Sequence, residues 1–152
     1  MASLNVWLLA ARPKTLPAAV APVLIGTAMA YTDYGFHALS ALAAMLGALL
    51  IQIGTNFAND YADFVKGTDT SERLGPMRVT QAGLVSSAAI RNATVVVFGL
   101  AFLIGMYLVY RGGWPIAIIG LLSILFGVLY TSGPFPLAYI GIADLFVLIF
   151  FG

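Results

Sequence analysis

Residues 34–69 read YGFHALSALAAMLGALLIQIGTNFANDYADFVKGTD. The first part of this stretch, residues 34–59, contains no Asp, Glu, Lys or Arg. A transmembrane helix needs roughly 20 mainly apolar residues, so this part predicts a membrane-spanning helix. The second part, residues 56–69, places three carboxylates and two amides in fourteen positions, although the chain has only six acidic residues. Acidic residues at the end of a membrane-length segment are costly and indicate a functional site.

The composition indicates a membrane protein. The chain has 152 residues, of which 61% are hydrophobic and 9% charged, whereas charged residues make up about 25% of a typical soluble domain. The formal net charge is +1 and there is no basic cluster, so no strong field favours nucleic acid as a partner. Cysteine is absent, which excludes disulfides and cysteine-based chemistry.

Uncharged segments of membrane length recur along the chain. They cover residues 15–32, 34–59, 92–110 and 112–143, and the last is interrupted by Gly133-Pro134-Phe135-Pro136. The sequence therefore predicts an all-α, polytopic transmembrane helical bundle with four full spans and the start of a fifth near Leu137, which carries Asp144. Residues 1–152 form one transmembrane domain in this interpretation. Because the chain stops within an apolar run, we expect it to be truncated at its C-terminus.

The basic residues predict the orientation of these spans. Lys and Arg are enriched in cytoplasmic loops. Six of the seven basic residues fall either before the first apolar segment or in residues 60–91, which would lie on the same side: Arg12, Lys14, Lys66, Arg73, Arg78 and Arg91. We therefore expect a multi-pass protein of the cell membrane in which the acidic loop faces the cytoplasm.

The acidic stretch has helical spacing. Asn56, Asn59, Asp60 and Asp63 follow the pattern i, i+3, i+4, i+7, so a helix continuing from the second span would carry them on one face. Gly67 can turn the chain back and return Asp69 as a third carboxylate. Oxygen ligands at this density suit Mg²⁺, which usually bridges carboxylates to a substrate phosphate. The alternative is a solvated helix end, where Asn and Asp are common.

Cationic residues follow the acids. Lys66, Arg73 and Arg78 lie within the next fifteen positions after Asp63, and Arg suits bidentate phosphate contacts. Acidic residues that can bind a metal, followed by basic residues that can bind phosphate, predict a diphosphate site. Two alternatives remain: charges that only set the orientation of the chain, or a small transporter that binds its cation at the acids. A transporter site near mid-membrane would not need Arg73 and Arg78 in a loop.

The run N-D-Y-A-D at residues 59–63, with Asp69 after it, resembles the first aspartate-rich motif of the UbiA superfamily of intramembrane prenyltransferases. The longer runs NFANDYADFVKGTD and ERLGPMRVTQAG resemble the branch that prenylates 1,4-dihydroxy-2-naphthoate. ARPKTL at residues 11–16 and GPFPLAYIGIADLFV at residues 133–147 are similar to that branch too. The resemblance covers essentially the whole chain.

The resemblance implies a larger helical bundle and a Mg²⁺-dependent transfer of a polyprenyl group from its diphosphate to the naphthoate, with loss of carboxylate, in menaquinone or phylloquinone synthesis. Another aromatic acceptor is the alternative within the superfamily. The residues implied are metal ligands Asn59, Asp63 and Asp69; catalytic Asp63, Asp60 and Asp69; and substrate-binding Asn56, Asn59, Lys66, Arg73, Arg78 and Lys14. The superfamily's second aspartate-rich motif has no counterpart among residues 1–152, so we expect this chain to be inactive by itself.

Overall fold

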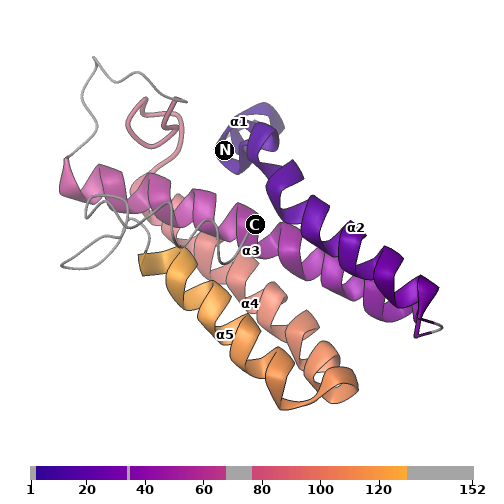
Figure 1. Cartoon of the computed structure of the whole chain (residues 1–152). Coiled ribbons are helices and arrows are strands. Elements are labelled where there is room, and N and C mark those ends of the chain that lie inside the picture. Colours follow the sequence, from indigo (N-terminus) through magenta and orange to yellow (C-terminus); the bar gives the residue numbers. More distant parts are fainter. Residues whose placement is uncertain (1–2, 34, 68–76, 130–152) are drawn as a thin grey trace, which may run out of the picture.

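The computed structural model describes residues 3–33, 35–67 and 77–129. All regular structure in these residues is helical (Figure 1). The elements are α1 (Leu4–Ala11), the short 3-10 helix η1 (Pro13–Thr15), α2 (Leu16–Thr32), α3 (Ala38–Lys66), α4 (Ser87–Gly112) and α5 (Trp114–Leu129). The predicted all-α class is confirmed.

Three helical segments are long and apolar enough to cross a membrane: Leu4–Thr32, Ala38–Lys66 and Ser87–Gly112. The prediction of four full spans is wrong over the described residues. Gly113, with φ of 73°, separates α4 from α5. The described part of α5 has 16 residues and extends about 24 Å, short of the roughly 30 Å hydrocarbon core, and the residues after Leu129 lie outside the described part of the chain. The predicted start of a fifth span, including Asp144, lies outside the described residues.

Local sequence explains where the helices begin and end. Arg12 adopts a left-handed φ of 51° between α1 and η1, and so interrupts the first segment. Gly67, with φ of 62°, ends α3, as its conformational freedom predicted. The Ser86 hydroxyl accepts a hydrogen bond from the Ala89 amide and caps α4. The sequence grouped Arg91 with the polar connection of residues 60–91. Because α4 begins at Ser87, Arg91 instead lies within the first turns of this helix.

Helix α3 is the centre of the bundle and packs against α1, α2, α4 and α5 (Figure 1). Two glycines permit close approach of its neighbours. A Cβ atom at Gly54 would lie 2.7 Å from the Phe98 ring of α4, and one at Gly127 of α5 would lie 2.5 Å from the Thr55 hydroxyl. Small residues at such crossings are typical of membrane helices, where close van der Waals packing drives association.

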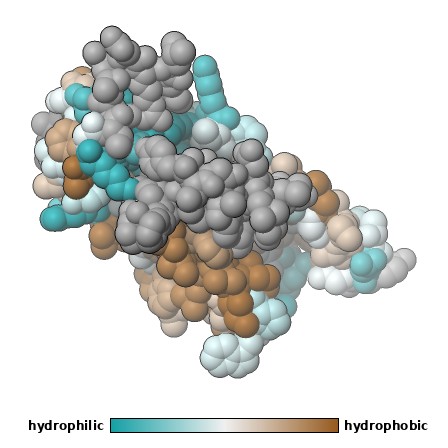
Figure 2. Space-filling model, turned by 60° about the vertical axis from the view of Figure 1, so that its left-hand side comes forward, coloured by the Kyte–Doolittle hydropathy of each residue, from teal (hydrophilic) through white to brown (hydrophobic). Residues whose placement is uncertain are grey.

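The outer surface of the helices is apolar. Large hydrophobic side chains are exposed along α2, α4 and α5, including Ile25, Val95 and Ile118. In Figure 2 hydrophobic residues gather over the lower middle of the visible face and hydrophilic ones toward its upper left. Apolar surface on this scale needs a partner. Together with the three membrane-length segments, it identifies an integral membrane protein whose helices contact the lipid bilayer.

Candidate functional site

The polar face of α3, which we define as Asn56, Asn59, Asp60 and Asp63, lies near the C-terminal end of this helix. All four residues are buried, with exposed fractions of 4%, 7%, 1% and 2%. Asp60 comes 22 residues after Ala38, or about 33 Å along the helix. If α3 enters the membrane at Ala38, this face therefore lies near the far boundary of the hydrocarbon core, which is roughly 30 Å thick.

An apolar cluster supports the polar face. Phe57 of α3, Ala10 of α1, Ile90 of α4 and Val79 of the intervening loop are packed together and buried. Trp7 of α1 meets the Phe57 ring edge to face, with centroids 5.7 Å apart. This packing holds α1 and the loop against the end of α3, and so excludes water from the polar groups beside it.

Asn56 binds the corner between α1 and α2. Its Nδ2 donates to the Ala11 carbonyl and to the Thr15 hydroxyl, both at 2.9 Å. The Thr15 hydroxyl donates in turn to the Arg12 carbonyl at 2.9 Å. Arg12 holds the left-handed conformation noted above, which costs about 1–2 kcal/mol for a non-glycine residue. Asn56 therefore fixes the segment that carries Arg12 and Lys14 against α3.

Asp60 binds the loop after α3. Its carboxylate accepts hydrogen bonds from the backbone amides of Val79 and Thr80, at 3.0 and 3.2 Å. Residues 79–84 form one helical turn, closed by the Gly83 amide on the Thr80 carbonyl and the Leu84 amide on the Val79 carbonyl, as in a Schellman motif. Asp60 thus satisfies the otherwise unpaired amides at the start of this turn.

Asp63 forms a buried ion pair with Arg78. The Arg78 guanidinium donates to Asp63 Oδ2, and the side chains are only 6% and 2% exposed. Removing charges from water is expensive, so a buried pair persists only where each charge has its partner. Because Asp60 holds the two residues after Arg78, the two carboxylates together determine where this arginine lies.

The structure therefore brings together five of the predicted site residues: the polar face of α3 and Arg78. The helix predicted to carry the four α3 residues is confirmed. Three of these residues bind different parts of the chain: Asn56 binds the α1–α2 corner, Asp60 binds loop amides and Asp63 binds Arg78. Lys14, in the middle of η1, and Lys66, the last residue of α3, are both exposed. Asp69 and Arg73 lie outside the described residues. Two features of the site were not predicted from the sequence. Thr15 has no signal except its position two residues after Pro13, and the backbone amides that Asp60 binds have no side-chain signal.

The chemistry of these side chains fits a hard divalent cation. Asn59 and Asp63, one turn apart on α3 and both buried, offer the amide and carboxylate oxygens that Mg²⁺ prefers. Within the described ranges no three His, Cys, Asp or Glu side chains are grouped to hold a metal ion. Asp60 is bonded to backbone amides. The third ligand predicted from the sequence, Asp69, belongs to residues 68–76, which the structure does not describe.

The fold and the site define a class: a helical integral membrane protein with buried acids and an arginine where a central helix reaches the membrane boundary. Comparison with protein families agrees with this class. Residues 19–152 match the family model described as the UbiA prenyltransferase family. The chain belongs to this family.

Curated relatives narrow the comparison. The chain is 42% identical to the 1,4-dihydroxy-2-naphthoate octaprenyltransferase of Escherichia coli (strain K12), over 96% of this chain and 49% of the relative. The chain is 38% identical to the Haemophilus influenzae protein of that name, over 98% of this chain and 51% of the relative. It is 39% identical to the Mycobacterium tuberculosis protein of that name, over 100% of this chain and 52% of the relative. The chain thus spans about half the length of these relatives. No solved structure matches significantly.

Proposed function

We propose that the protein containing residues 1–152 transfers a polyprenyl group from a polyprenyl diphosphate to 1,4-dihydroxy-2-naphthoate in menaquinone synthesis. One observation carries this proposal: five relatives, 37–42% identical to the chain, bear the name 1,4-dihydroxy-2-naphthoate octaprenyltransferase. The buried acids and arginine at the end of α3 support it, because a membrane-embedded diphosphate needs both metal ligands and cations. Residues 1–152 would form the N-terminal part of the transferase domain.

The proposed donor site is the polar face of α3 with its neighbouring cations. Asn59, Asp63 and Asp69 would hold Mg²⁺, which supplies positive charge to the diphosphate. Arg78, Arg73, Lys66 and Lys14 would bind the diphosphate oxygens. The ion pair between Asp63 and Arg78 suits this arrangement, because before the donor binds each buried charge is neutralised by the other. On binding, Asp63 would turn to the cation and Arg78 to the phosphate.

The reaction follows from charge. The bond between the allylic carbon and the diphosphate oxygen breaks, and the leaving diphosphate carries the electron pair. Cationic groups in a water-poor site stabilise that developing charge far more than they would in water. The electron-rich naphthoate ring then forms the new carbon–carbon bond, and its carboxylate leaves as carbon dioxide. Apolar surface beside the site would accommodate the prenyl chain.

Two residues of the polar face are assigned positioning roles in this proposal. Asp60 would place Arg78 through the turn that it caps, and Asn56 would place Lys14 through the corner that it binds. The distribution of basic residues supports a cytoplasmic orientation of this end of the bundle in the cell membrane. Both roles need the residues to remain bonded as they are, without contact with substrate.

The test is a chimera in which residues 1–152 replace the matched half of the Escherichia coli relative. The chimera is assayed in vesicles with Mg²⁺, octaprenyl diphosphate and 1,4-dihydroxy-2-naphthoate. Asp63→Asn should lower kcat about 100- to 1,000-fold, the range seen when one group that stabilises developing charge is removed. Asp33→Asn is the matched control, because Asp33 is exposed at the other end of the bundle. Unchanged turnover in Asp63→Asn would refute the proposed role of this acid.

A further inference from the structure

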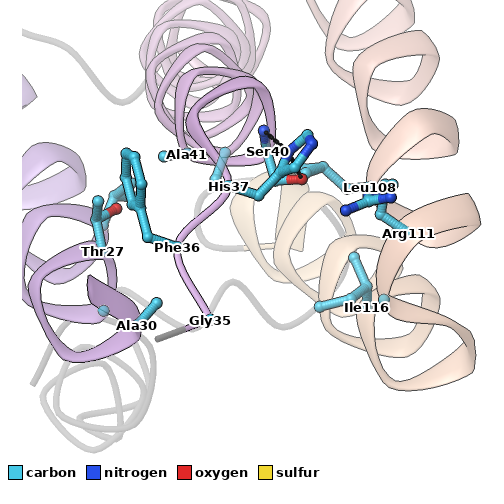
Figure 3. Close-up of a pocket in the computed structure, with 14 residues that line it drawn as sticks. Thr27, Ala30, Gly35, Phe36, His37, Ser40, Ala41, Leu108, Arg111 and Ile116 are labelled. Atoms are coloured by element: carbon cyan, nitrogen blue, oxygen red, sulfur yellow. Dashed lines mark hydrogen bonds between the residues drawn. The ribbon is translucent and has the colours of Figure 1, made fainter. Parts of the chain in front are cut away.

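A cavity of about 460 Å³ lies at the opposite end of the bundle from the polar face of α3. Its walls come from the C-terminal half of α2, residues 35–37, the first turns of α3, the last turns of α4 and the start of α5 (Figure 3). Ser40, on its wall, is 20 residues before Asp60 on the same helix, or about 30 Å away. The cavity is therefore separate from the proposed donor site.

One part of the cavity wall is polar and cationic. Arg111, in the last turn of α4, lines the cavity together with His37 and Ser40. In Figure 3 the Arg111 guanidinium points from α4 toward the space beside the His37–Ser40 pair. No residue in the described part of the chain forms an ion pair or a hydrogen bond with the Arg111 side chain. This arginine is thus available to an external anion.

His37 adds a donor to this wall. Its Nδ1 accepts a hydrogen bond from the Ser40 amide at 3.2 Å. In the neutral ring the other nitrogen, Nε2, then carries the proton and donates. The Ser40 hydroxyl lies 3.1 Å from the same Nδ1 and 3.4 Å from the Tyr107 hydroxyl. A guanidinium, an imidazole N–H and a hydroxyl are the groups that bind phosphate oxygens.

Most of the remaining cavity wall is apolar, which favours an amphiphile over a free ion. Val23, Ala30, Leu108 and Ile116 line it, and the exposed apolar surface of α2 continues from it at Ile25 and Met29. A headgroup phosphate could bind Arg111 while its acyl chains follow this surface of α2. Inorganic phosphate would gain nothing from either apolar region.

The cavity lies at the depth of lipid headgroups. Tyr110 and Trp114, on either side of the turn between α4 and α5, are 85% and 81% exposed. Exposed Trp and Tyr at helix ends are typical of the membrane–water interface. Among the described residues that line the cavity there is no Asp or Glu, so nothing there would pair with the amine of a zwitterionic headgroup. The charges fit a headgroup that is negative overall.

We propose that this cavity binds the phosphate of an anionic membrane phospholipid, with Arg111 as the principal contact and His37 as a second donor. The site differs from the donor site in place and in ligand, and it does not depend on the proposed function.

The experiment uses the 152-residue chain in detergent and measures binding of short-chain phosphatidylglycerol by native mass spectrometry. Phosphatidylcholine of the same chain length and inorganic phosphate are the comparison ligands. The intact chain should retain phosphatidylglycerol at least about tenfold better than phosphatidylcholine, because only the former is negative overall. Arg111→Gln should weaken phosphatidylglycerol binding about 10- to 150-fold, the usual effect of one charge-assisted hydrogen bond.

Two further variants make the result specific. Arg91→Gln is the matched control, because Arg91 is an exposed arginine at the other end of the same helix, and it should bind as the intact chain does. Gly26→Phe fills the cavity without removing charge, since a Cβ at Gly26 meets no atom within 4 Å, and should also weaken binding. The proposal is overturned if Arg111→Gln and Gly26→Phe both bind normally, if Arg91→Gln weakens binding equally, or if inorganic phosphate displaces the lipid.

Discussion

Replacing Asp60 by asparagine tests whether this acid acts by holding the loop after α3. The Asp60 carboxylate accepts the amides of Val79 and Thr80, and hydrogen bonds to a charged group contribute about 1.5–3 kcal/mol each. Asparagine keeps one oxygen, but its NH₂ group would face a backbone donor. The free energy of opening this turn should therefore fall by about 2–3 kcal/mol. This corresponds to roughly a 30- to 150-fold increase in the equilibrium constant for opening.

The assay is hydrogen–deuterium exchange of the chain in lipid nanodiscs, followed in peptides from residues 77–86. Amides in this turn should exchange faster in Asp60→Asn by the stated factor, while those in the middle of α3 and α4 remain protected. Asp33→Asn is the control, because that exposed carboxylate lies far from the turn. Exchange at Val79 and Thr80 within twofold of the intact chain would refute the argument.

Two further predictions concern the ion pair and the contact between α3 and α4, both followed by unfolding in detergent. Asp63→Asn or Arg78→Gln alone should each lower the free energy of unfolding by about 3–5 kcal/mol, because each breaks the ion pair of a buried charge. The double variant should lose clearly less than the sum of the two. Additive losses would show that the pair is not coupled. Gly54→Val should destabilise the bundle by about 1–3 kcal/mol because its Cβ would meet the Phe98 ring, whereas Gly99→Val, with open space around it, should be nearly neutral; equal losses would contradict the proposed close packing.

Much of the site could be predicted because its spacing is local. The period of a helix places residues at i, i+3, i+4 and i+7 together whatever the rest of the chain does, so the polar face of α3 followed from the order of residues alone. Gly67 was a predictable end of α3 because glycine readily adopts the left-handed conformation that closes a helix. The structure describes three full spans and not the predicted four, because the described part of the fourth segment ends at Leu129, where the described residues end.

The partners of these side chains could not be predicted. Asp63 and Arg78 are 15 positions apart, and Asp60 and Thr80 are 20 apart, so a sequence pattern does not tell which acid meets the arginine. The sequence predicts Asp60 as a catalytic acid beside the metal ligands Asn59, Asp63 and Asp69. In the structure its carboxylate is bonded to two backbone amides, a contact that no side-chain pattern encodes. The role of Asn56 at the α1–α2 corner was hidden for the same reason.

The order of residues by itself determined that the protein is helical, that it belongs in a membrane and that acids and amides gather near the end of one helix. These features depend on hydrophobicity and on helical period, which are properties of short segments. Only the tertiary structure decided that Asp63 pairs with Arg78, that Asp60 holds a turn, and that Arg111 and His37 line one cavity. Such contacts join segments separated along the chain, and their geometry is fixed only when α3 packs against all of its neighbours.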